Sequence, residues 1–134
     1  MHRVSSIMLW HCFLTYLTNM LTLFMGWQIT YYSENVRKII DSWPVGIRAF
    51  YARLTERIKL YGPNLGMPFT RSMGHGLFEI RAKGNEGIGR AFFCTVVGNK
   101  IILLHAFIKK TQKTPQKELK IARQRLKEVR HENP

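Results

Sequence analysis

The fold is decided by residues 77–108, which read LFEIRAK-GNEG-IGRAFFCTVV-GN-KIILLHAFI. Three runs in this stretch are rich in Ile, Phe, Val and Leu, most of which favour strands, and the segments GNEG and GN separate them. Short glycine and asparagine segments of this kind make tight turns between antiparallel strands. The stretch therefore predicts a three-stranded meander over 77–83, 88–97 and 100–108.

A strand and a helical hairpin are predicted before the meander. Apolar and polar residues alternate over 27–32, which is the period of a half-buried strand. Ser33 can cap a helix that ends before Pro44, because proline stops a helix. Apolar residues at spacings of three and four over 45–61 predict a second, amphipathic helix that ends at Gly62.

The remaining segments complete the predicted topology. Residues 62–76 hold four of the ten glycines and two of the five prolines, so we expect a surface connection there. After the meander, Thr114 as a cap and Pro115 as the first helical residue indicate the start of a basic C-terminal helix. The order of elements predicts an α+β fold with a small antiparallel sheet, one face of which the helical hairpin covers.

Composition limits the classes of function. The chain of 134 residues carries 21 Lys and Arg against 8 Asp and Glu, a net charge of +13, and 46% of its residues are hydrophobic. A chain of this size forms one domain, and so strong a positive charge favours a polyanionic partner. The sequence has no phosphate loop, zinc-protease or serine-hydrolase motif and only two distant cysteines, so we expect no cofactor, disulfide framework or metal site.

Residues 1–25 differ from the rest because they are apolar and almost uncharged. Three interpretations stay open: Met25 is the true start and an upstream stretch has been translated, the segment is a hydrophobic leader or membrane anchor, or it is a helix packed on the domain. Polar residues within the run argue against membrane insertion. We therefore divide the chain into a leader over 1–25 and a domain over 26–134, and we expect the protein in the cytoplasm.

Positive charge gathers on the predicted strands and at their ends. Glu79, Arg81 and Lys83 project to one face of their strand, because alternate side chains of a strand share a face. Arg90 lies inside the next strand, where a cation needs a partner to offset its lost hydration. Lys109 follows the third strand. The pattern predicts that cations gather at the ends of the strands.

Three segments resemble the RelE/ParE toxin superfamily, in particular its HigB-like, phage-derived branch: GLFEIR at 76–81, RAFF at 90–93 and LLHAFIKKTQKTP at 103–115. The similarity extends over residues 27–129. It implies the strand, hairpin and meander architecture predicted above. It also implies a toxin of a type II toxin–antitoxin system that cuts messenger RNA on the ribosome, with a helix-turn-helix antitoxin of the HigA type as its partner.

The chemistry implied by this resemblance assigns roles to particular residues. Metal-free RNA cleavage uses the 2′-hydroxyl as nucleophile, so the protein must bind the adjacent phosphate and accept the hydroxyl proton. Arginine binds phosphate through a planar, permanently charged fork, and we assign that role to Arg81 and Arg90. The general base stays open among Glu79, His105 and a lysine crowded by other cations, such as Lys109.

Further cations are predicted to bind flanking phosphates or ribosomal RNA: Lys83, Lys110, Lys113, Lys117, Lys120 and Arg123. A structural interpretation stands beside each functional one. In the structural interpretation, Glu79 and Arg81 form an ion pair with a neighbouring strand, His105 is a buried core residue, and the helix charges are a solvated surface.

Two other functions remain as alternatives. A ParE-like inhibitor of DNA gyrase would share the predicted fold and have no enzymatic activity. A basic nucleic-acid-binding module without activity would bind through charge, with an affinity that falls steeply with salt. Growth arrest with cut messenger RNA distinguishes the nuclease from both.

Overall fold

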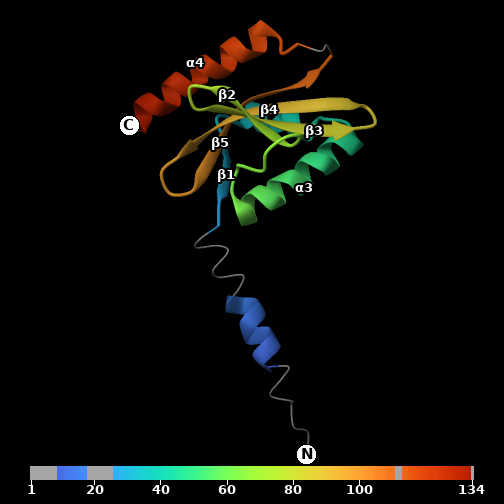
Figure 1. Ribbon diagram of the computed structural model, residues 1–134, viewed down its shortest axis with the longest axis vertical. Coiled ribbons are helices and arrows are strands. Elements are labelled where there is room, and N and C mark those ends of the chain that lie inside the picture. Colours follow the sequence, from blue (N-terminus) through green and yellow to red (C-terminus); the bar gives the residue numbers. More distant parts are fainter. Residues whose placement is uncertain (1–8, 18–25, 111–112, 134) are drawn as a thin grey trace, which may run out of the picture.

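The computed structural model describes residues 9–17, 26–110 and 113–133. It confirms the α+β class, with one five-stranded sheet between layers of helices (Figure 1). The strand order in the sheet is β1-β5-β4-β3-β2. In chain order the elements are β1 (Gln28–Tyr31), α2 (Glu34–Asp41), α3 (Val45–Tyr61), β2 (Thr70–Gly74), β3 (Leu77–Gly84), β4 (Gly87–Val96), β5 (Lys100–Lys109) and α4 (Gln116–Glu132).

The predicted meander is confirmed as β3, β4 and β5, which pair antiparallel. Gly98 and Asn99 connect β4 to β5 with φ of 89° and 56°, a conformation that these two residue types tolerate best. The sheet as a whole is mixed, whereas the sequence predicted an antiparallel one, because β1 pairs with β5 in parallel. No tight turn joins β1 to β5, so nothing local imposes an antiparallel direction on that pair.

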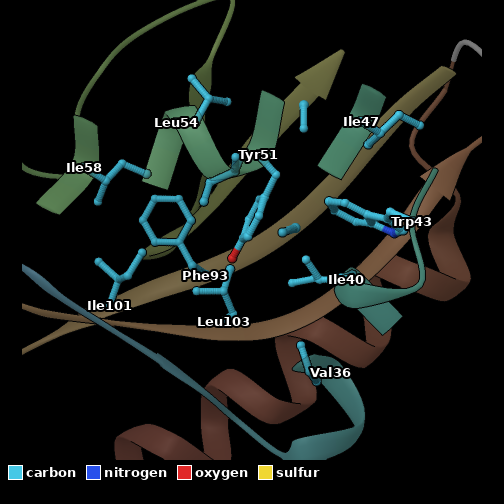
Figure 2. Packing of buried hydrophobic residues seen from close by; sticks show 14 residues of the cluster. Val36, Ile40, Trp43, Ile47, Tyr51, Leu54, Ile58, Phe93, Ile101 and Leu103 are labelled. Carbon is cyan, nitrogen blue, oxygen red and sulfur yellow. The ribbon is translucent and has the colours of Figure 1, made fainter. Parts of the chain in front are cut away.

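The helical hairpin of α2 and α3 covers one face of the sheet, as predicted. Burying an aliphatic or aromatic side chain contributes about 1.5–3 kcal/mol, so this layer supplies a large part of the stability. Figure 2 shows the layer from close by, with side chains of α2, α3 and the link between them packed against β4 and β5: Val36, Ile40, Trp43, Ile47, Tyr51, Leu54, Ile58, Phe93, Ile101 and Leu103.

Gly89 on β4 shows how closely the hairpin approaches the sheet. A Cβ atom there would lie 2.7 Å from Cγ2 of Ile47 and 2.8 Å from Cζ3 of Trp43. Overpacking a core costs about 1–3 kcal/mol, so we expect Gly89→Ala to lower the free energy of unfolding by that amount in urea denaturation. The cost should be smaller in an Ile47→Ala background, which opens space for the new methyl group. Equal costs in both backgrounds would contradict this packing.

The C-terminal helix α4 covers the opposite face and forms a second, smaller core. This core joins side chains from α4 to side chains from the three meander strands: Ala122, Leu126, Val129, Leu77, Phe92, Cys94 and Leu104. The narrow apolar stripe of α4 therefore faces the sheet, and its basic residues surround that contact.

The segment 62–76 contains a strand, where the sequence predicted only a surface connection. Thr70–Gly74 form β2 at the edge of the sheet, paired antiparallel with β3. Its sequence, TRSMG, has no apolar alternation, so no local pattern indicates a strand. The pairing with β3 stabilises it, and this pairing places Arg71 opposite Glu79.

Residues 9–17 are helical, and apolar side chains among them are exposed, including Trp10 and Phe13. The predictions for residues 1–8 and 18–25, among them the start at Met25, lie outside the described residues. Within the described part of the chain, no helix is long and apolar enough to cross a membrane. The boundary between leader and domain stays a prediction.

Candidate nucleic-acid site

The candidate site lies on the face of the sheet that carries α4. Alternate residues of a strand share a face, so side chains in register project the same way. The register places three rows across β3, β4 and β5: Glu79 with Phe92 and His105, Arg81 with Arg90 and Phe107, and Lys83 with Ile88 and Lys109.

Glu79 is the centre of the site. Its side chain is fully buried, and its carboxylate contacts one arginine of its own strand and one of each neighbouring strand. Oε1 lies 3.5 Å from Nε of Arg71 on β2 and 3.6 Å from Nε of Arg81 on β3. Oε2 lies 3.3 Å from Nη1 of Arg90 on β4. These four residues, named here the arginine cluster, hold one negative and three positive charges, so the cluster keeps a positive charge.

The arginines of the cluster differ in exposure. The side chains of Arg71 and Arg81 are 36% and 21% exposed, whereas that of Arg90 is only 2% exposed. Burial lowers the pKa of Arg90, the charge of Glu79 opposes this shift, and the other two arginines add to it. Arg90 is thus an inner cation, and Arg71 and Arg81 are the two that reach solvent.

Thr114 connects the start of α4 to the arginine cluster. Its hydroxyl oxygen accepts a hydrogen bond from Nη1 of Arg90 at 2.5 Å and another from Nη2 of Arg71 at 3.4 Å. The sequence predicted Thr114 as the helix cap, but the helix begins at Gln116 with Pro115 at the cap position and no side-chain capping bond. That prediction was wrong by one residue, and the Thr114 hydroxyl accepts hydrogen bonds from the two arginines instead of capping the helix.

Hydrogen bonding inside the arginine cluster is incomplete. Both carboxylate oxygens of Glu79 and the Nε atoms of Arg71, Arg81 and Arg90 are buried and have no hydrogen-bond partner in the described chain. The carboxylate oxygens instead make ion contacts at 3.3–3.6 Å with Nε of Arg71, Nε of Arg81 and Nη1 of Arg90. A buried polar group without a hydrogen bond costs free energy and calls for an explanation, of which a functional role is one.

Lys109, the last residue of β5, lies next to the arginine cluster. Loss of hydration lowers the pKa of its ammonium group, and the charges of Arg90 and Arg81 lower it further, while Glu79 partly opposes them. The neutral amine of Lys109 is therefore easier to form than that of an ordinary lysine.

His105 lies on the same face but has different partners. It is 8% exposed, its Nε2 is hydrogen-bonded to Glu118 of α4, and its Nδ1 lies 3.5 Å from Nη1 of Arg125. Phe92 stands between His105 and Glu79 in the register, so two strand spacings, about 10 Å, separate them. His105 connects β5 to α4 and does not belong to the arginine cluster.

The predicted binders of flanking phosphates fall into two groups. Arg123 donates to the carbonyl oxygens of Met73 at 2.8 Å and Gly74 at 3.4 Å, so it fixes α4 to the end of β2. The others are exposed lysines: Lys83, Lys110, Lys113, Lys117 and Lys120.

Sequence reasoning missed two residues of the site, Arg71 and the hydroxyl of Thr114. Nothing in the local sequence marks Arg71, because its position depends on the register between β2 and β3. No group of three His, Cys, Asp or Glu side chains that could hold a metal occurs among the described residues. The arrangement as it stands can hold an oxyanion through its arginines, with a lysine amine beside it.

The fold and the site define a small, basic α+β protein whose sheet carries several arginines around one carboxylate. The sequence model of the phage-derived Gp49-like protein family (DUF891) matches residues 38–127, which include the whole arginine cluster. The chain therefore belongs to this family, which is part of the RelE/HigB-like toxin family. Membership is consistent with a toxin of a toxin–antitoxin system, which has an antitoxin as partner. No curated protein matches the chain.

Proposed function

We propose that the protein is a HigB-like toxin of a type II toxin–antitoxin system, which cuts messenger RNA on the ribosome in the cytoplasm. A helix-turn-helix antitoxin of the HigA type neutralises it. The observation that carries the proposal is the arginine cluster, which keeps a positive charge and presents Arg71 and Arg81 to solvent. An RNA phosphate would offset that charge, and the family of the chain supports the toxin class.

Arg81 is the proposed ligand of the phosphate at the cut. Glu79 contacts the Nε atom of Arg81 and holds the side chain in place. The partly exposed guanidinium group of Arg81 can then bind two phosphate oxygens at once. Arg71 supplies a second cation at the surface, and Arg90 supports both from inside the sheet. Positive charge held in place before the reaction stabilises the charge that develops on the phosphorane.

Lys109 is the proposed general base. Its neutral amine takes the proton of the 2′-hydroxyl, the 2′-oxygen attacks phosphorus, and the 5′-oxygen leaves with a proton from solvent. The products are a 2′,3′-cyclic phosphate and a 5′-hydroxyl. Of the other base candidates, Glu79 is buried out of reach of a substrate hydroxyl and His105 is bonded to Glu118. Glu79 is accordingly a positioning residue for the arginines.

The exposed lysines extend the proposed contact along the RNA and onto the ribosome. Lys83 follows Arg81 on β3, and Lys110 and Lys113 lie between β5 and α4. Lys117 and Lys120 continue the positive surface along α4. Binding through many phosphate contacts releases counterions, so the affinity should fall as salt rises.

Expression without the antitoxin tests the proposed function. We expect growth arrest and transcripts cut within their coding regions, mapped by primer extension, with Lys38→Ala on the surface of α2 as an active control. Arrested cells with intact transcripts, together with blocked gyrase in a plasmid supercoiling assay, would contradict the nuclease.

The pH dependence of cleavage tests Lys109. Because the neutral amine is the base, the single-turnover rate should rise with pH and level off at the lowered pKa of Lys109, below the ordinary value of 10.5. Lys109→Arg keeps the charge but cannot release its proton, so we expect a rate about 100-fold lower and no such rise. Lys110→Arg should retain both rate and profile. The wild-type pH profile in Lys109→Arg would rule out this base.

A further inference from the structure

A pocket of about 330 Å³ lies beside the arginine cluster and shares Arg81 with it. The pairing of β2 with β3 reaches only from Gly74 to Thr70, opposite Leu77 to Ile80, so the last residues of β3 have no β2 partner. The pocket lies at this uncovered end, and its volume is that of a small-molecule site. Its lining comes from α3, the segment before β2, and the ends of β3 and β4: Phe50, Pro68, Phe69, Arg81, Lys83 and Ile88.

One wall of the pocket is aromatic. The rings of Phe50 and Phe69 are partly exposed, with centroids 6.2 Å apart and planes tilted by 33°. The guanidinium groups of Arg53 and Arg57 lie over these two rings, each 5.3 Å from a centroid. Partly exposed aromatic rings among cations are a combination on which nucleobases stack in proteins that bind single strands.

The other wall is polar and cationic. Arg81 and Lys83 line it, and their side chains lie on the same face of β3. The backbone N–H of Arg81 donates to the carbonyl oxygen of Phe69 at 2.8 Å, so the backbone groups of Arg81 point toward the β2 side. By the alternation of a strand, those of Lys83 point the same way, where β2 no longer runs. The backbone N–H and C=O of Lys83 therefore offer a donor and an acceptor to the polar edge of a nucleobase.

We propose that this pocket binds one nucleobase of the RNA whose phosphate Arg81 holds, and that it selects the nucleotide next to the cut. The inference rests on the proposed function, which supplies the RNA. A bare phosphate would leave the wall of Phe50 and Phe69 unused, and a purely apolar ligand would leave Arg81 and Lys83 without a partner. A nucleotide satisfies both walls.

Binding of adenosine 5′-monophosphate to the full chain tests the pocket without any cleavage. In NMR spectra of protein labelled at phenylalanine, this nucleotide should shift the ring resonances of Phe50 and Phe69, and ribose 5-phosphate should not. Phe69→Leu keeps the apolar volume but removes the ring, so we expect its affinity for the nucleotide to fall about 10-fold. Phe78→Leu is the matched control: its ring stacks on Phe93, 5.5 Å away, and does not line the pocket.

Three results would overturn the proposal. The first is equal affinity for the nucleotide and for ribose 5-phosphate, and the second is an unchanged nucleotide affinity in Phe69→Leu. The third is that the ring resonances of Phe50 and Phe69 shift when an antitoxin is added but not when the nucleotide is added. The proposal and the function on which it rests can fail separately. Nucleotide binding that needs Phe69, in a protein that cuts no RNA, would uphold the pocket and contradict the nuclease. Cleavage by Phe69→Leu at unchanged positions would contradict the pocket and leave the nuclease standing.

Discussion

Glu79→Ala should lower the free energy of unfolding by about 3–5 kcal/mol, because removing one partner of a buried ion pair leaves the other charge uncompensated. Here three arginines would lose their shared carboxylate, and Arg90, with a side chain only 2% exposed, could not turn toward solvent. Urea denaturation measures the effect. Glu56→Ala removes an exposed ion pair with Lys59 at 3.1 Å and should cost less than about 1 kcal/mol.

A second substitution separates charge repulsion from simple loss of packing. Arg90→Met removes the innermost cation and keeps much of its apolar volume, so Glu79→Ala should cost less in that background than in the wild type. A Glu79→Ala protein as stable as the wild type would show that the carboxylate does not hold the arginines together.

Arg81→Ala should slow RNA cleavage by about 100-fold to 1000-fold, which is the usual loss when one group that stabilises a developing anion is removed. The side chain of Arg81 is partly exposed, so the fold should survive its removal. Single-turnover cleavage on programmed ribosomes measures the rate, and the urea midpoint checks the fold. Arg37→Ala, a surface arginine of α2, should cleave at the wild-type rate.

A lysine at position 81 refines this result. Arg81→Lys keeps the positive charge but loses the planar fork that binds two oxygens, so it should recover only part of the rate. Full activity in Arg81→Ala would remove this residue from the phosphate site.

The features that the sequence predicted correctly are those set by local pattern. The meander follows from apolar runs separated by glycine and asparagine, and the hairpin from apolar spacing that ends at Pro44 and Gly62. The placement of Glu79 and Arg81 on one face of β3 follows from the alternation of a strand, and their charged groups lie 3.6 Å apart. The sequence also placed Arg90 inside the next strand, but its contact with Glu79 depends on the register between β3 and β4.

The features that it missed depend on contacts between distant segments. β2 exists because β3 offers an edge to pair with, so neither the strand nor the role of Arg71 can be read from TRSMG. The ladder between β4 and β5 shifts register at Phe92 and Phe93, and both Leu104 and His105 then meet α4. Simple alternation would have placed those two neighbours on opposite faces.

The burial of Glu79 also could not be read from its own strand. On β3 it has one cation two residues away, which leaves the choice between a base and an ion-pair partner open. Arg71 and Arg90 come from strands on either side, and together with Arg81 they enclose the carboxylate. A fully buried carboxylate among three arginines holds those cations in place, and His105 is bonded to Glu118, so Lys109 is the proposed base.

The central claim is that the arginine cluster and Lys109 cut RNA through its own 2′-hydroxyl without a metal. The direct measurement places a single 2′-deoxynucleotide at the mapped cleavage position of a messenger RNA on the ribosome. The account predicts no cut at that position, and a 2′,3′-cyclic phosphate end on the all-ribose control. Cleavage of the 2′-deoxy message at the wild-type rate would contradict it.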